Sequence, residues 1–131
     1  MKKLAIPFLA FLLLSSCDDD DTKNIDITSG TWRLVEQLAD PGDGSGTFQP
    51  VRSEKTLQFL ENGSVVTNKS LCDPYSEEQI ASGTYSIETG IINTSCSNEF
   101  IKTIFFEVKN GALILDFISN EGFSQKYRRF P

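Results

Sequence analysis

The amino-acid sequence predicts an all-β protein, a small eight-stranded antiparallel up-and-down barrel with little or no helix outside an N-terminal leader. From residue 30 onward, apolar and polar residues alternate in short runs, which is the period of a β-strand. Glycine-containing turns separate four pairs of these runs at hairpin spacing. No long stretch between them has helical periodicity, so the crossover helices of a parallel sheet are not expected.

The predicted strands begin with "GTWRLVEQL", in which two faces alternate: Trp32, Leu34, Glu36 and Leu38 against Thr31, Arg33, Val35 and Gln37. The remaining strands are expected at 54–60, 64–68, 83–87, 91–95, 102–108, 112–118 and 123–130. Turns at 61–63, 88–90, 109–111 and 120–122 connect hairpins. The Gly/Pro-rich stretch 39–50 and the polar stretch 74–82 are predicted loops, and the second has room for one helical turn.

An antiparallel meander of eight strands best removes its exposed edges by closing into a barrel. A two-sheet sandwich is the main alternative, because immunoglobulin-like sandwiches space their strands similarly. Trp32 precedes both Cys72 and Cys96, so the Cys…Trp…Cys order of true immunoglobulin domains is absent. We therefore favour the barrel.

The N-terminus has the organisation of a secretory signal peptide. Lys2 and Lys3 precede an apolar run at 4–14, and small residues follow at Ser15 and Ser16. The apolar run is shorter than the roughly 20 residues that span a bilayer. We expect three parts: a lipoprotein signal peptide at 1–16, a lipidated cysteine with an acidic tether at 17–29, and the barrel domain at 30–131.

The sequence "LSSC" resembles the bacterial lipobox. This resemblance implies that Cys17 becomes the first residue of the mature protein and carries acyl chains, so that a membrane is its partner through lipid. Two such chains already anchor a protein stably. An ordinary signal peptide followed by an unrelated cysteine is the alternative.

Four aspartates follow Cys17 directly: Asp18, Asp19, Asp20 and Asp21. One interpretation is a solvated acidic linker, because like charges repel and extend a chain. The run also resembles the export signal of Bacteroidota lipoproteins, which implies a lipid anchor on the outer face of the outer membrane. In other Gram-negative bacteria an aspartate here resembles an inner-membrane retention mark. The cell surface is the expected location, and a periplasm-facing anchor is the alternative.

The chain is acidic, with a formal net charge of −6. Without the leader it keeps ten basic and eighteen acidic residues, a net charge of −8. No basic stripe is visible in the sequence, and phosphate contacts dominate nucleic-acid affinity. We therefore expect neither nucleic acid as a partner nor a domain that lies flat on anionic lipid.

Catalytic and metal-binding patterns are not found in the sequence. There is no histidine, which removes the commonest general base and metal ligand, and no glycine-rich phosphate loop. Asp40 and Asp43 lie in a glycine-rich stretch that lacks the oxygen ligands of a calcium loop. We expect a non-enzymatic protein with no cofactor and no metal.

Cys72 and Cys96 remain once Cys17 is assigned to lipid. An even pair in an oxidising compartment favours a disulfide, which would close a loop of about 25 residues and contribute about 3 kcal/mol. Two free buried thiols are the alternative, since two cysteines without histidine make a poor zinc site.

At "GTWRL", Gly30 and Trp32 form a Gly-x-Trp motif that resembles the opening motif of the lipocalins (calycins). The resemblance implies that Trp32 closes one end of the barrel and that an arginine of the last strand, Arg128 or Arg129, lies across it. Such a cation–π contact is worth about 1 kcal/mol. The region 30–130 also resembles the short lipocalin-like domains of Bacteroidota lipoproteins.

Aromatic residues provide the remaining functional indication. Phe59, Tyr85, Phe106, Phe117 and Tyr127 fall, like Trp32, on inward positions, where they either pack the core or line a ligand cavity. The first hypothesis is a carrier of a small apolar or amphipathic ligand, with selectivity from the loops 39–53 and 69–82. The second is a protein-interaction module with a filled barrel, such as an inhibitor or a surface-complex subunit. The interior volume separates the two.

Overall fold

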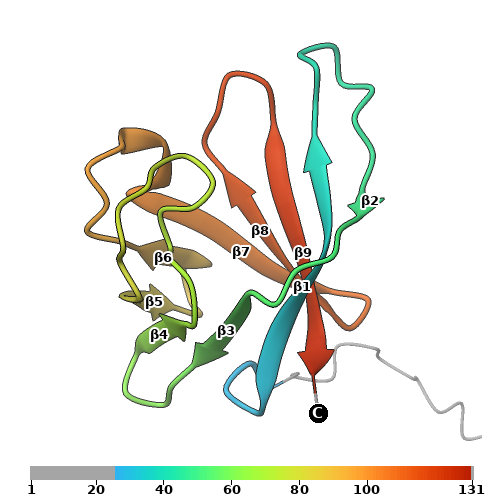
Figure 1. Cartoon of the computed structure of the whole chain (residues 1–131). Helices are drawn as coiled ribbons and strands as arrows, with labels where there is room; N and C mark the ends of the chain where they lie inside the picture. Colours follow the sequence, from blue (N-terminus) through green and yellow to red (C-terminus); the bar gives the residue numbers. More distant parts are fainter. Residues whose placement is uncertain (1–25, 131) are drawn as a thin grey trace, which may run out of the picture.

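The last strand pairs with the first, and this pairing closes the sheet into a barrel (Figure 1). The computed structural model describes residues 26–130. In chain order the elements are β1 (Thr31–Ala39), β2 (Gln49–Pro50), β3 (Thr56–Phe59), β4 (Ser64–Thr67), β5 (Ser82–Ser86), β6 (Ile91–Asn93), η1 (Glu99–Ile101), β7 (Thr103–Lys109), β8 (Ala112–Phe117) and β9 (Phe123–Phe130). All neighbouring strands are antiparallel. The all-β, eight-stranded, up-and-down barrel predicted from the sequence is confirmed.

Strand β2 is an addition to the eight. It lies in the stretch predicted as a loop and pairs with the second half of β1, at Glu36 and Gln37. Strand β3 pairs with the first half of β1, at Trp32 and Arg33. β2 and β3 therefore both pair with one edge of β1, and β9 pairs with the opposite edge. The stretch 74–82 contains no helix, and the single helical turn of the described chain is η1.

A β-bulge in β1 corrects the predicted alternation of that strand. The register with β9 shifts between Leu34 and Glu36. One extra residue exchanges the two faces of the strand beyond it. Glu36 therefore lies on the outer side, 3.2 Å from the Lys126 amine, while Gln37 faces inward to Gln125. The sequence predicted Glu36 and Leu38 on the same face as Trp32, and that prediction was wrong after Leu34.

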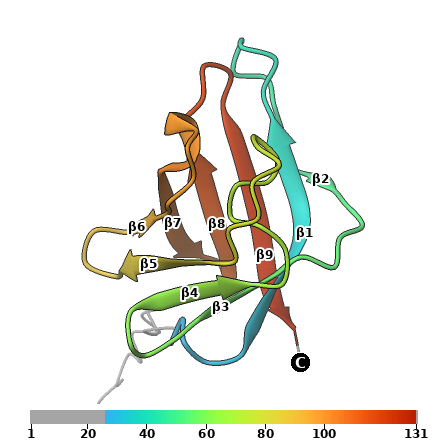
Figure 2. The same ribbon diagram turned by 60° about the vertical axis from the view of Figure 1, so that its left-hand side comes forward.

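The two ends of the barrel have different connections (Figures 1 and 2). Short turns join β3 to β4, β5 to β6 and β7 to β8 at one end, which we call the closed end. In the last of these turns Asn110 and Gly111 both have positive φ, 53° and 75°, as a two-residue hairpin of type I′ requires. Longer segments at 40–48, 68–81, 94–102 and 118–122 form the other end, which we call the mouth.

Side chains fill the barrel interior. Trp32, Leu57, Phe59, Val65, Ile92, Ile104, Leu113 and Tyr127 are each at most 1 % exposed. Leu71 of the mouth segment 68–81 also reaches inward, against Gly83 of β5. A Cβ at position 83 would lie 2.5 Å from the Asn93 carbonyl and 3.1 Å from Leu71, so only glycine leaves this space.

The chain packs on the closed end before the predicted domain start at residue 30. Ile27 is 4 % exposed and belongs to the core. Its carbonyl accepts a hydrogen bond of 3.1 Å from the indole nitrogen of Trp32. Residues 26–29 therefore belong to the folded domain rather than to the tether. Within residues 26–130, no helix has the length and apolar character needed to cross a membrane.

Candidate functional site

At the closed end, Arg129 takes the position that the lipocalin resemblance implied for an arginine. Arg129 and Trp32 are opposite partners in the β1–β9 ladder, and the guanidinium lies 4.8 Å from the centre of the indole ring. It also donates hydrogen bonds to the carbonyls of Asp26 and Ser29. Arg128 instead opposes Arg33 on the outer face. Gly30, with φ +83°, makes the turn that leads into β1.

The five aromatic residues considered as candidates for lining a ligand cavity belong to the packed core or lie against it. The Phe59 ring contacts Tyr85 edge-on at 5.0 Å between centroids and Phe106 at 5.5 Å. The Tyr85 hydroxyl donates to the Leu60 carbonyl at 2.7 Å. Phe117 and Tyr127 belong to the same core and are 6 % and 0 % exposed. None of these five side chains lines the open cavities described below.

A short chain of polar side chains lies on the inner face of β1 and β9. The buried Tyr127 hydroxyl donates to the Gln125 side-chain oxygen at 2.7 Å, and the Gln125 amide donates to Gln37 at 3.1 Å. Burial raises the pKa of Tyr127 far above its ordinary value, with a smaller contribution from the Asp73 carboxylate. The phenol therefore stays protonated and serves as a donor.

The mouth holds a polar cavity of about 860 Å³. It is lined by Ser53, Lys55, Lys69, Ser70, Asp73, Pro74, Tyr75, Ser76, Glu77 and Gln79. Most of these residues belong to the mouth segment 68–81. Lys55 and Ser70 are the buried members of the lining, at 4 % and 3 % exposure.

The Lys55 amine is buried, and few neighbouring groups offset the free-energy cost of burying its charge. It precedes β3 and shares the inward face of Leu57 and Phe59 by alternation. Its nitrogen donates to the Asp73 carbonyl at 3.4 Å, and neither ion pair found in residues 26–130 includes it. Burial lowers the pKa of Lys55 from its ordinary value, against a smaller opposing effect of the Asp73 carboxylate. An added anion would offset the cost of burying this charge.

A second, apolar cavity of about 430 Å³ lies beside the first at the mouth. Its aromatic lining consists of Tyr75, Phe100 and Phe123. The Tyr75 ring lies 5.7 Å from Phe123, 5.9 Å from Phe117 and 6.4 Å from Phe100, between centroids. Because Tyr75 also lines the polar cavity, one side chain forms a wall of both.

The predicted disulfide is confirmed, and it joins two mouth segments. Cys72 lies in 68–81 and Cys96 in 94–102, with 5.8 Å between their Cα atoms. The same two segments are linked by the Glu78 carboxylate, which accepts hydrogen bonds from the amide of Ser97 at 3.0 Å and from its hydroxyl at 3.2 Å. These hydrogen bonds lower the pKa of Glu78. The cross-links hold Tyr75 and Phe100 near each other.

The loop that carries Asp40 and Asp43 is held by hydrogen bonds to carboxylates. Asp40 accepts from the amides of Gly42 at 2.7 Å, Gly44 at 2.9 Å and Gly46 at 2.8 Å. These bonds lower the pKa of Asp40. Among the described residues, no three His, Cys, Asp or Glu side chains gather as a metal site would require.

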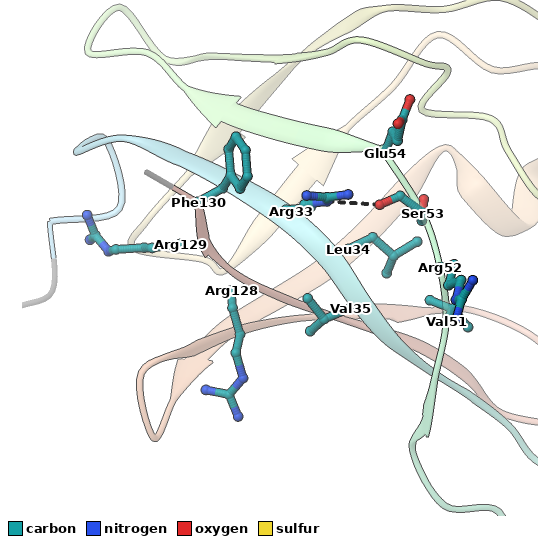
Figure 3. Close-up of a pocket in the computed structure, with 10 residues that line it drawn as sticks. All are labelled: Arg33, Leu34, Val35, Val51, Arg52, Ser53, Glu54, Arg128, Arg129 and Phe130. Carbon is teal, nitrogen blue, oxygen red and sulfur yellow. Dashed lines mark hydrogen bonds between the residues drawn. The ribbon is translucent and has the colours of Figure 1, made fainter.

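A cationic cleft of about 570 Å³ lies on the outer face of β1 and β9 (Figure 3). We call it the arginine cleft, and its lining residues are Arg33, Leu34, Val35, Val51, Arg52, Ser53, Glu54, Arg128, Arg129 and Phe130. The chain contains four arginines, and all four are in this set. We found no basic stripe in the sequence and did not predict this cluster, because the four arginines are separated by up to 96 positions.

Cys17 and Asp18 to Asp21 lie outside the described residues. The sequence reading also missed Lys55, Tyr75, Phe100 and Phe123 as site residues. Lys55 could have been predicted, because it lies two positions before Leu57 on an inward face. Tyr75, Phe100 and Phe123 could not, because they meet only through contacts between distant segments. No protein-family model matches the chain, and no curated protein or solved structure is detectably similar to it.

Proposed function

We propose that this protein is a lipid-anchored envelope protein whose barrel mouth binds a small amphipathic anion. The ligand's acidic group pairs with the Lys55 amine, and its apolar part lies against Tyr75, Phe100 and Phe123. The proposal keeps the predicted carrier function and moves the ligand from the barrel interior to the mouth. It assigns the protein binding rather than catalysis.

The buried amine of Lys55 carries the proposal. Burying an unpaired ammonium is costly, and proteins normally place a counter-charge or several hydrogen bonds beside it. Lys55 has one long hydrogen bond to a carbonyl and lines an open cavity. A carboxylate or phosphate in that cavity would form a charge-assisted pair with it, and Lys69 lines the same wall.

Tyr75 supports the amphipathic nature of the ligand. It separates a polar cavity of about 860 Å³ from an apolar one of about 430 Å³. Both volumes are within the range of small-molecule sites. A ligand that crosses Tyr75 would place an acidic head by Lys55 and an apolar tail by Phe123.

The anchor and the lipocalin-like character belong to the proposal as well. Lipidation of Cys17, and export directed by Asp18 to Asp21, are supported by the leader sequence. The eight-stranded barrel and the Arg129–Trp32 contact at one end are compatible with a lipocalin-like protein. A cell-surface location would present the mouth to ligands outside the cell.

The filled interior favours one alternative, a protein-interaction module. A barrel packed with side chains leaves the loops as the binding surface. Phe100 at the mouth is 40 % exposed, as a contact residue for a protein partner would be. This alternative makes no use of the buried Lys55 amine, so a Lys55 variant separates the two functions.

The test is binding of dansyl-labelled undecanoic acid and of its uncharged methyl ester to residues 22–131. This span includes every strand of the closed barrel and its disulfide. We expect the acid to bind at least about tenfold more tightly than the ester, a difference of about 1.4 kcal/mol. In Lys55→Met this preference disappears, while the control Lys109→Met, an exposed lysine at the closed end, retains it. Equal binding of acid and ester by the unaltered protein would contradict the proposal.

A further inference from the structure

The arginine cleft has cationic groups without anionic partners. In residues 26–130, no arginine takes part in an ion pair. Arg33 donates to the Ser53 carbonyl at 3.0 Å, and its guanidinium lies 5.2 Å from the Phe130 ring centre. Arg33 and Arg128 are direct partners across β1 and β9 on the same outer face. Like charges in that position destabilise a sheet unless an anion lies between them.

The guanidinium groups are spread along the cleft rather than directed at one point. In Figure 3, Arg128 and Arg129 extend from the end of β9 in different directions, Arg33 points to Ser53, and Arg52 lies on the segment that carries Ser53. One small anion cannot reach all four in this arrangement. An extended polyanion fits this arrangement better, because its charges are distributed along several residues. Four consecutive extended residues span about 13 Å.

The described chain begins beside one residue of the cleft lining, Arg129. Arg129 lines the cleft and also donates to the carbonyl of Asp26, the first described residue. Asp21 is five residues before Asp26, a span of about 17 Å when extended. The run Asp18 to Asp21 is therefore within reach of the cleft, and the short connection gives it a high effective concentration there. Arginine and carboxylate also form the strongest type of charge-assisted pair.

We propose that the arginine cleft binds the chain's own aspartates, Asp18 to Asp21. Glu54 is the one carboxylate of the cleft lining, so the cleft keeps an excess of positive charge for these aspartates. Docking shortens the tether and holds the closed end of the barrel towards Cys17. The mouth, at the opposite end, then faces away from the residue that we expect to be lipidated. The contact does not depend on the ligand proposed for the mouth.

An anionic membrane surface is the competing occupant. Asp26, the first described residue, accepts a hydrogen bond from Arg129 of the cleft lining, so lipid phosphates around a lipidated Cys17 are a second source of negative charge. In the sequence, the four aspartates lie between Cys17 and Asp26. Their negative charge repels lipid phosphates, and they are connected to the barrel by a short segment, so we favour the tether as the occupant of the cleft.

The experiment follows the Nε–H signals of the arginines by proton–nitrogen correlation spectroscopy of residues 18–131. The barrel closes entirely within residues 26–130, so this protein folds without its leader. Four arginines give four signals, which single Arg→Lys variants assign. The tether variant replaces Asp18, Asp19, Asp20 and Asp21 by Asn. The control variant replaces Glu61, Glu88, Glu107 and Glu121, four exposed residues outside the cleft, by Gln and changes the net charge equally.

We expect the signals of Arg33, Arg52 and Arg128 to shift between the unaltered protein and the tether variant, but not in the control. The shift should disappear in about 0.5 M salt, because exposed ion pairs are screened. Coincident spectra of the unaltered protein and the tether variant would overturn the proposal. Phosphatidylglycerol vesicles provide the second arm, with phosphatidylcholine vesicles as the uncharged comparison. Arginine signals that change only with phosphatidylglycerol would assign the cleft to lipid and would also overturn it.

Discussion

The closed end and the mouth of this barrel are built from different interactions. At the closed end, Trp32, Phe59 and Tyr85 are packed in apolar contact, and the polar groups among them have hydrogen-bond partners. At the mouth, the buried Lys55 amine has one long hydrogen bond, and the surrounding loops are held by a disulfide. The comparison indicates that apolar packing stabilises the closed end, while at the mouth a buried charge lowers stability and the disulfide offsets part of that cost.

The largest effect is expected at the closed end, from Phe59→Ala. Phe59 is fully buried and contacts Tyr85 and Phe106, so its truncation leaves a cavity. We expect a loss of about 3–5 kcal/mol in the free energy of unfolding, measured by urea denaturation. Phe105→Ala, on the outer face and 44 % exposed, is the control and should cost far less. Similar losses for both variants would mean that the closed end is not the stabilising region.

Removing the disulfide with Cys72→Ala and Cys96→Ala together acts at the mouth. The bond closes a loop of 24 residues in sequence separation, so its loss should cost about 3 kcal/mol. It should also weaken ligand binding, because it cross-links the segments that carry Tyr75 and Phe100. Thermal unfolding with and without reductant measures the first effect. Reductant should lower the midpoint of the unaltered protein and leave that of the variant unchanged.

Lys55→Met should stabilise the protein while it removes anion binding. Replacing an uncompensated buried charge by an apolar side chain of similar length should raise the free energy of unfolding by about 1–3 kcal/mol. Destabilisation by Lys55→Met would show instead that the lysine serves the fold. Lys109→Met, which alters an exposed lysine, should change little.

The pH dependence of this gain has a defined sign. Burial lowers the pKa of Lys55 in the folded protein, while the unfolded value stays near 10.5. Below the folded pKa, the unaltered protein bears the full cost of the charge. As pH rises from the folded pKa towards 10.5, the folded amine loses its proton first, so the unaltered protein gains stability relative to Lys55→Met. Denaturation of both proteins along an alkaline pH series should therefore show a shrinking difference.

The smallest of these effects is expected for Arg129→Ala, at the closed end. The contact with Trp32 is worth about 1 kcal/mol, and the exposed guanidinium is partly solvated. Loss of its hydrogen bonds should also free residues 26–29 from the barrel, which amide hydrogen exchange at Ile27 would report. Arg128→Ala, at the neighbouring position, should leave this exchange unchanged.

Local patterns in the sequence were sufficient to predict most of the fold. Alternation and glycine turns gave eight strands in the right order, and the even cysteine pair gave the disulfide. The bulge after Leu34 could not be predicted, because the composition of the strand does not indicate one extra residue. The bulge places Gln37 on the inner face rather than the outer one. Strand β2 is two residues long and exists only through its pairing with β1.

The sites depend on contacts between distant segments. Tyr75 and Phe100 meet because the mouth loops are cross-linked, and nothing in either local sequence indicates it. The arginine cleft likewise needs the β1–β9 register to place Arg33 opposite Arg128. Lys55 could have been predicted from the sequence, because its side chain is on the same strand face as Leu57 and Phe59, which are buried in the barrel.

The most direct measurement is native mass spectrometry of the full-length protein, extracted with detergent from its own envelope, in the unaltered form and as Lys55→Met. We expect the unaltered protein to carry an acidic amphiphile that is released on mild denaturation, and Lys55→Met to be recovered without it. Recovery of both proteins without a bound molecule, with no uptake of the dansyl-labelled acid by either, would contradict a ligand site at the mouth.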